Sequence, residues 1–307
     1  MSRVAAIDCG TNSIRLLIAD VGERKLADVF REMRIVRLGQ GVDRTGEFSQ
    51  EALDRTFAAC DEYAKLIEDC SVEKVRFVAT SASRDVSNRE AFVAGVKARL
   101  GIEPEIISGL EEAGLSFVGA ISSLPSDVRH GSVLVVDIGG GSTELVRGQD
   151  GSMKIAKSVD IGCVRMTERW LKDDPPTPKQ IAGAVADIDA AIALADSVVD
   201  IKQASILIGL AGSVTTVAGI AMGLREYDSQ AIHASRISAA RVTDTATSLL
   251  AQTREQRSRI PVMHPGRVDV IGGGALVLNR IMRFGGFDQV VVSEHDILDG
   301  IALAIAP

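Results

Sequence analysis

The chain of 307 residues is long for a single hydrophobic core, so its length predicts two domains of ordinary size. Its hydrophobic content of 46%, with few aromatic residues, is typical of an α/β protein with buried strands. The net charge of −7 argues against broad binding of nucleic acid or of an anionic membrane, and one Trp, two Tyr and eight Phe leave little for stacking on bases. A polyanionic substrate must therefore be met by local arginines and a metal ion.

The cysteines and the uncharged segments point to a soluble cytoplasmic protein. The four cysteines form no C-x-x-C pair and no cluster with histidine, which favours reduced, buried thiols over a zinc site or a disulfide framework. The N-terminal sequence reaches Asp8 too soon for a signal peptide. Residues 204–224 carry no charge over a membrane-spanning length, but the central AGSVTT is a turn signal. We therefore expect a short strand and a small-residue helix there rather than a membrane span.

In chain order, the first half opens with a meander of three strands, at residues 3–9, 14–21 and 25–37. The glycines of RLGQGVDRTGE (37–47) mark a surface loop. Ser49 then caps a long amphipathic helix that ends at about Cys70.

The rest of the first half alternates strands with helices. A strand at 75–80 leads into a TSASR turn, and Ser87 with Glu90 forms a capping box for a helix that ends at Gly101. The strand EPEII follows, and Ser108 opens another helix.

The second half repeats this plan, with strands at 132–138, 142–148 and 153–160. TPKQ (177–180) marks a strong helix start. The remaining elements are the strand SILIGL, the AGSVTT turn and a helix, a helical region at 239–260, a helix through VDVIGGGALVLNRIM, the strand QVVVS and the closing helix DILDGIALAI. This pattern of gene duplication predicts two similar α/β domains, residues 1–122 and 123–307, with a cleft between them. The closing helix, residues 296–307, can pack back on the first domain.

The most informative motif is D-x-G-x-x-S-x-x-L, which occurs once in each half, directly after an apolar run that ends in Asp8 or Asp137. Its glycine allows a tight turn whose N–H groups point at an anion, and the aspartate at the strand end can hold a hydrated cation. The copies differ where the first has Arg15 and the second has Glu144. We therefore interpret the first loop as a phosphate clamp and the second as a site for a metal or a water. For Arg15 itself, an outward solvated position is an equally good interpretation.

Six motifs then follow one another in a specific order: DCGTNS, RLGQGVD, TSASR, EIISGLEEA, DIGGGSTE and IGCVRMTER. In this order and spacing they resemble the exopolyphosphatase/guanosine pentaphosphate phosphohydrolase (Ppx/GppA) family, over nearly the whole chain. The resemblance implies two ribonuclease H-like domains of the actin-like ATPase superfamily, with the active site in the cleft between them. The long enzymes of that family carry an additional C-terminal helical region, so the length of this chain favours short or medium polyphosphate chains.

The resemblance also implies roles for individual residues. Glu112 is the expected general base, and Asp137 with Glu144 is expected to hold Mg²⁺ or Mn²⁺. The expected phosphate contacts are Asn12, Ser13, Arg84, Gly139, Gly141 and Ser142. Glu111, the neighbour of Glu112, lies three residues after Ser108, a spacing that favours a structural role in the helix cap.

The function implied by the resemblance is hydrolysis of the terminal phosphoanhydride bond of inorganic polyphosphate, with release of orthophosphate. Removal of the 5′ γ-phosphate of guanosine pentaphosphate is the alternative within the family. The resemblance is also compatible with a homodimer. The glycine run at 272–274 keeps a third interpretation open, because in related sugar kinases a similar run lies against adenosine. A protein that binds guanosine alarmones without hydrolysing them is the fourth, although it would have no need of Glu112.

Overall fold

The structure is a computed structural model that describes residues 2–22 and 25–305. Its contacts divide the chain into two compact units: residues up to Gly119 together with those from Ile297 onward form unit 1, and Ala120–Asp296 form unit 2. Within the described ranges, no helix is both long and apolar enough to cross a membrane. The predicted α/β class with two sheets is confirmed, and positions 306 and 307 of the expected closing helix lie outside the described residues.

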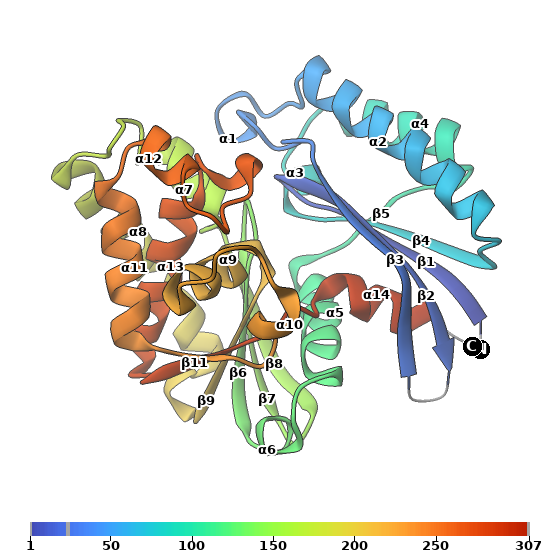
Figure 1. The fold of residues 1–307 in the computed structure, drawn as a ribbon. Helices are drawn as coiled ribbons and strands as arrows, with labels where there is room; N and C mark the ends of the chain where they lie inside the picture. The colour runs from blue at the N-terminus through green and yellow to red at the C-terminus, as the bar shows by residue number, and fades with distance from the viewer. Residues whose placement is uncertain (1, 23–24, 306–307) are drawn as a thin grey trace. The chain divides into compact units, whose positions relative to one another are not determined.

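Unit 1 is built on a five-stranded sheet in the order β3-β2-β1-β4-β5 (Figure 1). The predicted meander is its antiparallel part, and β4 and β5 extend it in parallel from β1. The strands are β1 (Ser2–Cys9), β2 (Ser13–Gly22), β3 (Lys25–Ile35), β4 (Lys74–Ala79) and β5 (Glu105–Ile106).

Helices cover both faces of this sheet, so its central strand β1 is buried on both sides (Figure 1). Alternate residues of β1 point to opposite faces: Ala5 and Ile7 join the core beneath α2 and α4, whereas Val4 and Ala6 join the core beneath α14. The helices are α1 (Val42–Thr45), α2 (Gln50–Asp69), α3 (Ser81–Arg84), α4 (Arg89–Leu100), α5 (Gly109–Ser122), which runs on into unit 2, and α14 (Ile297–Ile305).

Unit 2 repeats the topology and adds one strand, in the order β10-β11-β9-β6-β7-β8. Its meander β6-β7-β8 corresponds to β1-β2-β3, and β9 and β11 continue in parallel from β6 as β4 and β5 do from β1. This doubled order is that of the ribonuclease H-like fold expected from the resemblance. The strands are β6 (Ser132–Ile138), β7 (Thr143–Gln149), β8 (Ser152–Val159), β9 (Ile206–Leu210), β10 (Arg236–Ser238) and β11 (Gln289–Val292).

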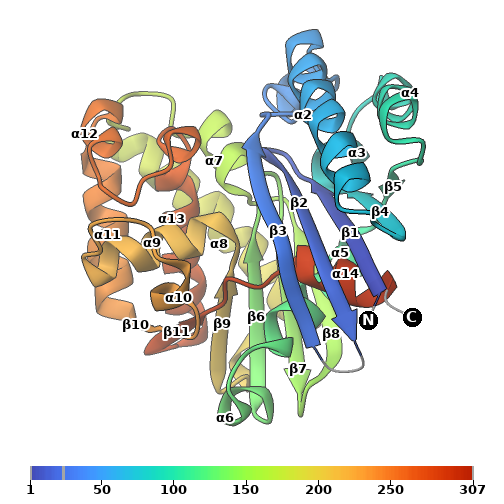
Figure 2. The same ribbon diagram turned by 45° about the vertical axis from the view of Figure 1, so that its right-hand side comes forward.

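The helices of unit 2 include a group of three, α8, α11 and α13, that share one large apolar core with the sheet (Figure 2). Short elements fill the connections. The helices are α6 (Ser126–Arg129), α7 (Cys163–Arg169), α8 (Pro178–Val199), η1 (Ile201–Gln203), α9 (Ala211–Met222), α10 (Ser229–Ile232), α11 (Ala239–Ala251), α12 (Arg254–Ser258), η2 (Pro265–Arg267) and α13 (Ile271–Gly285).

Two predicted helix starts are confirmed in atomic detail. The Ser49 side chain accepts a hydrogen bond from the N–H of Ala52 at the start of α2. At the start of α8, Thr177 and Gln180 form a full capping box. Each cap satisfies an N–H group that the first turn of a helix leaves unpaired.

The capping box expected from Ser87 and Glu90 is wrong. Helix α4 begins later, at Arg89, and its N-cap residue Asn88 makes no capping bond through its side chain. The Ser87 hydroxyl instead donates to the carbonyl oxygen of Gly46, which ties the loop before α2 to the loop before α4. A tertiary contact has here replaced a local one.

Three further expectations need correction. The TSASR and AGSVTT segments are not turns but the helix α3 and the beginning of α9. The expected surface loop at 37–47 contains α1 and is buried at its start, where Leu38 is fully covered. Of the cysteines expected to be buried, Cys70 is only half-buried, whereas the other three are buried thiols.

Candidate active site

The two copies of the D-x-G-x-x-S motif form the same turn. In unit 1 the N–H of Gly10 donates to the carbonyl oxygen of Ser13 at 2.9 Å, between β1 and β2. In unit 2 the N–H of Gly139 donates to the carbonyl oxygen of Ser142 at 3.1 Å, between β6 and β7. We call the turn at 10–13 loop 1 and the turn at 139–142 loop 2. Because both lie at the carboxyl end of the central parallel strand of their sheet, each has the position at which α/β proteins bind ligands.

Loop 1 is held by the segment that follows β3. The N–H of Arg37 donates to the carbonyl oxygen of Asn12 at 2.9 Å, and the N–H of Gly39 donates to that of Thr11 at 2.8 Å. Within the described residues, the N–H groups of Thr11 and Asn12 donate to no protein acceptor. With its carbonyl groups engaged and these N–H groups not, loop 1 presents donors to an anion.

Loop 2 is held in the same way by the beginning of α7. The N–H groups of Cys163 and Val164 donate to the carbonyl oxygens of Gly139 and Gly140, each at 2.9 Å. Among the residues that the structure describes, no acceptor takes the N–H groups of Gly140 and Gly141. The N–H of Gly139 already donates to Ser142, which leaves the N–H of Gly140 as an available donor. Sequence reasoning did not single out Gly140. It lies inside the DIGGGS run, which was the available signal.

A glycine lies where each supporting segment approaches its loop. A Cβ at Gly39 would lie 2.3 Å from Cγ2 of Thr11, and a Cβ at Gly162 would lie 2.2 Å from the carbonyl carbon and oxygen of Gly140. Contacts this short do not occur between real atoms. At Gly162 the clash is with backbone, so that position needs a residue without a side chain, whereas at Gly39 the Thr11 side chain would have to move. The RLGQGVD and IGCVRMTER motifs thus support the two loops.

The strand pairs behind the loops carry different side chains. In unit 1, Asp8 lies directly opposite Arg15. Nη2 and Nε of Arg15 donate to Oδ2 of Asp8 at 2.6 and 2.9 Å. Arg15 is therefore not solvated, and its guanidinium takes the place beside Asp8 that we considered for a hydrated metal cation. The two charges compensate each other in a largely buried pair.

In unit 2, Asp137 lies directly opposite Glu144, so both carboxylates are on the same face of the sheet. Asp137 is 7% exposed and Glu144 is fully buried. Ser158 lies opposite Glu144 on β8, and its hydroxyl donates to Oε1 of Glu144 at 2.7 Å. Sequence reasoning missed Ser158.

Two carboxylates beside a loop with available N–H donors fit a magnesium ion, which in proteins is held by one or two carboxylates, substrate phosphates and water. Asp137 and Glu144 are the residues that would hold it. No group of three or more histidine, cysteine or acidic side chains in the described part of the chain is arranged to hold a metal. The site therefore fits a metal whose remaining ligands come from substrate and solvent, rather than one enclosed by protein.

The expected base Glu112 lies in the first turn of α5 and is 7% exposed. Nη1 of Arg84 donates to its Oε2 at 2.8 Å and to the carbonyl oxygen of Ile107 at 3.1 Å. The helix α3, which carries Arg84, is joined to loop 1 by a hydrogen bond of 3.0 Å between the hydroxyls of Thr11 and Ser81. Unit 1 thus connects loop 1, Arg84 and Glu112 in one network.

Glu111 has the structural role expected of it, with a different partner. Its N–H donates to Oγ of Ser108, as in a helix cap. Its carboxylate accepts from Nη2 of Arg76 at 2.9 Å rather than returning to the cap. Glu111 and Glu112 therefore point to different partners, and only the Glu112 carboxylate joins the network of loop 1.

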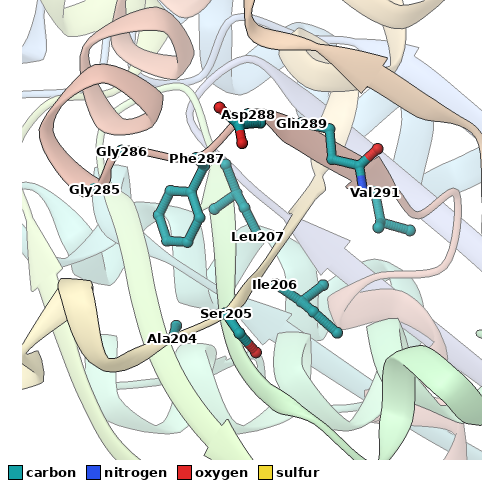
Figure 3. Close-up of a pocket in the computed structure, with 10 residues that line it drawn as sticks. All are labelled: Ala204, Ser205, Ile206, Leu207, Gly285, Gly286, Phe287, Asp288, Gln289 and Val291. Carbon is teal, nitrogen blue, oxygen red and sulfur yellow. The ribbon is translucent and has the colours of Figure 1, made fainter.

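A separate cavity of about 340 Å³ lies elsewhere in unit 2 (Figure 3). It is lined by the amino-terminal part of β9 and by the segment from α13 to β11, with Leu207, Phe287 and Asp288 among its residues. Loop 2 follows the carboxyl end of β6, which is parallel to β9, so this cavity lies at the opposite edge of the sheet. It is not part of the candidate active site.

Comparisons with known proteins identify the family of this chain. A model of the Ppx/GppA phosphatase family matches residues 17–307. Exopolyphosphatase 2 of Mycobacterium tuberculosis is 49% identical, over 100% of this chain and 99% of that protein. The bifunctional 3-dehydroquinate synthase/phosphatase of Fusobacterium nucleatum is 34% identical, over 97% of this chain and 46% of that protein.

Solved structures show the same relationship. The crystal structure of an exopolyphosphatase-like protein is similar with a TM-score of 0.95 and 46% identity, over 99% of this chain and 97% of that chain. The Ppx/GppA family member of Aquifex aeolicus follows with a TM-score of 0.81 and 30% identity, over the same shares of the two chains. By the family model, the identity to full-length relatives and the fold, this chain belongs to the Ppx/GppA phosphatase family.

Proposed function

We propose that this chain is a metal-dependent phosphoanhydride hydrolase that releases terminal orthophosphate from inorganic polyphosphate. The observation that carries the proposal is the 49% identity, over the whole chain, to a protein named Exopolyphosphatase 2. The two loops with available N–H donors support it, because a chain of phosphates offers anionic oxygens at every unit. Removal of the 5′ γ-phosphate of guanosine pentaphosphate is the second candidate, since the family name covers both activities.

Phosphate binding is the task of the loops. The N–H groups of loop 1 and loop 2, with the side chains of Asn12, Ser13 and Ser142, are proposed to hold phosphoryl oxygens and to fix the terminal phosphorus for in-line attack. Asp137 and Glu144 would hold Mg²⁺ or Mn²⁺, which when bound neutralises charge on the phosphate oxygens.

Activation of water is the task of Glu112. Its carboxylate takes a proton from the attacking water as the new P–O bond forms, and the bond to the remaining phosphate chain breaks with the electron pair on the departing oxygen. Arg84 positions this carboxylate through Nη1. In the described structure Nε and Nη2 of Arg84 donate to no protein group, so they are suited to a phosphate oxygen of the substrate.

The sugar-kinase alternative loses its main support. A Cβ at Gly274 would lie 2.2 Å from Oγ of Ser213 in α9, and one at Gly273 would lie 2.8 Å from the carbonyl oxygen of Cys163 in α7. These glycines are thus required for the close packing of α13 against two helices, whether or not a nucleotide binds. The alarmone-binding alternative leaves the buried Glu112 without a task.

The test is phosphate release from short polyphosphate, long polyphosphate and guanosine pentaphosphate, side by side, with Mg²⁺, Mn²⁺ or a chelator. We expect metal-dependent release from polyphosphate. Release from guanosine pentaphosphate alone would favour the second candidate, and sugar-dependent formation of ADP from ATP would support a kinase. Binding of alarmones without turnover of any substrate would overturn the hydrolase proposal.

Three accessory features belong to the same proposal: a cytoplasmic protein, a homodimer, and no partner among nucleic acids or membranes. The negative net charge of −7 supports the last of these, because nucleic acids and most membrane surfaces are anionic. Light scattering at several protein concentrations tests the homodimer directly.

A further inference from the structure

Three side chains form a row across the meander of unit 2. Asp137 on β6 is paired in register with Glu144 on β7, and Glu144 is paired with Ser158 on β8. Residues paired in this way project from the same face of the sheet. The row therefore runs from the carboxylate nearest loop 2 to a hydroxyl on the edge strand.

The middle member of this row is the least accessible. Glu144 is fully buried, so its carboxylate oxygens need hydrogen-bond donors from the protein. Ser158 is half-buried and donates to Oε1 at 2.7 Å, a short bond of the kind expected for a hydroxyl on a charged oxygen. Once Oε1 is fixed, the direction of Oε2 is fixed as well, because the carboxylate is planar.

The equivalent row of unit 1 shows what this hydroxyl adds. It consists of Asp8, Arg15 and Met33, in the same register across β1, β2 and β3. There the middle residue is a cation that compensates the aspartate directly. A serine hydroxyl thus accompanies the copy of the row in which two carboxylates face each other.

We propose that Ser158 is a positioning residue for the divalent metal, acting through Glu144. This inference rests on the proposed function, in which Asp137 and Glu144 hold the metal. Ser158 fixes the direction of the Glu144 carboxylate before the metal arrives. Hydrogen bonds to ligand carboxylates have this effect on metal affinity in other sites.

The test compares Ser158→Ala with Ser158→Thr, which keeps the hydroxyl, and with Ser152→Ala at the exposed start of the same strand. Direct binding of Mn²⁺ is measured by electron paramagnetic resonance without substrate, and phosphate release is measured against metal concentration. We expect Ser158→Ala to weaken Mn²⁺ binding by about 10–100-fold, the usual effect of losing such a partner. Maximal release should return at high metal, whereas Ser158→Thr and Ser152→Ala should behave as wild type.

The outcomes separate the inference from the proposed function. If Ser158→Ala binds Mn²⁺ as tightly as wild type while Asp137→Asn does not bind it, the positioning role is wrong and the metal site stands. If Ser158→Ala lowers phosphate release even at saturating metal and loses thermal stability, without a change in Mn²⁺ affinity, the role of Ser158 is only structural. If neither wild type nor any variant binds Mn²⁺ and release needs no metal, both proposals fail.

Discussion

Behind loop 1, the sheet of unit 1 places Asp8 opposite Arg15, whereas behind loop 2 the sheet of unit 2 places Asp137 opposite Glu144. The backbone around both loops is the same: a glycine closes the turn on a serine carbonyl, and a later segment engages the remaining carbonyl groups. The side chain opposite the aspartate differs, which gives an ion pair in one copy and two facing carboxylates in the other. The two copies thus share the backbone of the turn and its available N–H donors, and the residue opposite the aspartate decides whether the row is a compensated ion pair or a candidate metal site.

In the proposed mechanism the group that activates water lies outside both rows, so replacing it should have the largest effect. We expect Glu112→Gln to lower turnover by about 10²–10⁴-fold, the usual contribution of a positioned base. The amide oxygen can still accept from Arg84, so folding and Mn²⁺ binding should persist. Single-turnover phosphate release at saturating metal measures the effect.

The matched control for this variant is the neighbouring Glu111→Gln. Its carboxylate is 47% exposed and contacts Arg76 on the surface, so we expect wild-type turnover and a change in stability of about 0–1 kcal/mol. Wild-type phosphate release by Glu112→Gln would remove that residue from the mechanism.

The next effect separates the two rows themselves. We expect Asp137→Asn to reduce phosphate release by about 10²-fold or more, because it removes a metal ligand. Its free energy of unfolding in the metal-free protein is compared with that of the matched variant in unit 1.

The matched variant in unit 1, Asp8→Asn, should lower stability without weakening Mn²⁺ binding. It leaves the Arg15 guanidinium without its facing carboxylate, and Arg15 is 20% exposed, so we expect a loss of about 2–3 kcal/mol, below the ~3–5 kcal/mol of a fully buried pair. Urea unfolding and Mn²⁺ binding measure both variants. A loss of Mn²⁺ binding with Asp8→Asn and not with Asp137→Asn would reverse the assignment of the loops.

A smaller effect tests the supporting segments. A Cβ at Gly162 meets backbone atoms of Gly140, which cannot rotate away, whereas a Cβ at Gly39 meets a methyl group of Thr11. We expect Gly162→Ala to cost about 1–3 kcal/mol and to raise KM for polyphosphate, with a smaller change for Gly39→Ala. Equal effects of the two variants on KM would mean that the backbone of loop 2 moves aside as easily as the Thr11 side chain.

The sequence predicted the loops well because their signal is local. The pattern of aspartate, glycine and serine in each half predicts a tight turn between two strands, and the pairing of Asp8 with Arg15 follows from closing that turn between Gly10 and Ser13. The sequence analysis did not predict this ion pair, although the symmetric positions of the two residues around the turn were the available signal. A solvated Arg15 was retained as an alternative because strand alternation alone does not show what lies opposite.

Other parts of the site could not be predicted, because they depend on irregular strand register and on tertiary packing. Ser158 meets Glu144 only after a strand pairing that shifts register between Arg147 and Gly148. The packing of α7 against loop 2 likewise depends on tertiary structure. The glycine that this packing needs, Gly162, is the G of the IGCVR motif. The predicted cleft between the two domains, and the position of each loop in it, stay predictions.

The smallest expected effect concerns the cysteines beside the two loops. Cys9 ends β1 just before loop 1, and Cys163 begins α7 on loop 2. Burial raises the pKa of both thiols and raises the pKa of Cys60 to about 12, so at pH 8 all three are almost entirely the unreactive thiol. We expect a disulfide reagent at pH 8 to modify the half-buried Cys70 first, and all four cysteines only after denaturation. Mass spectrometry of the modified peptides identifies the order. Rapid modification of Cys163 without that of Cys9 would show that α7 leaves loop 2 in solution while β1 stays closed, and the support of the two loops would then differ as their chemistry does.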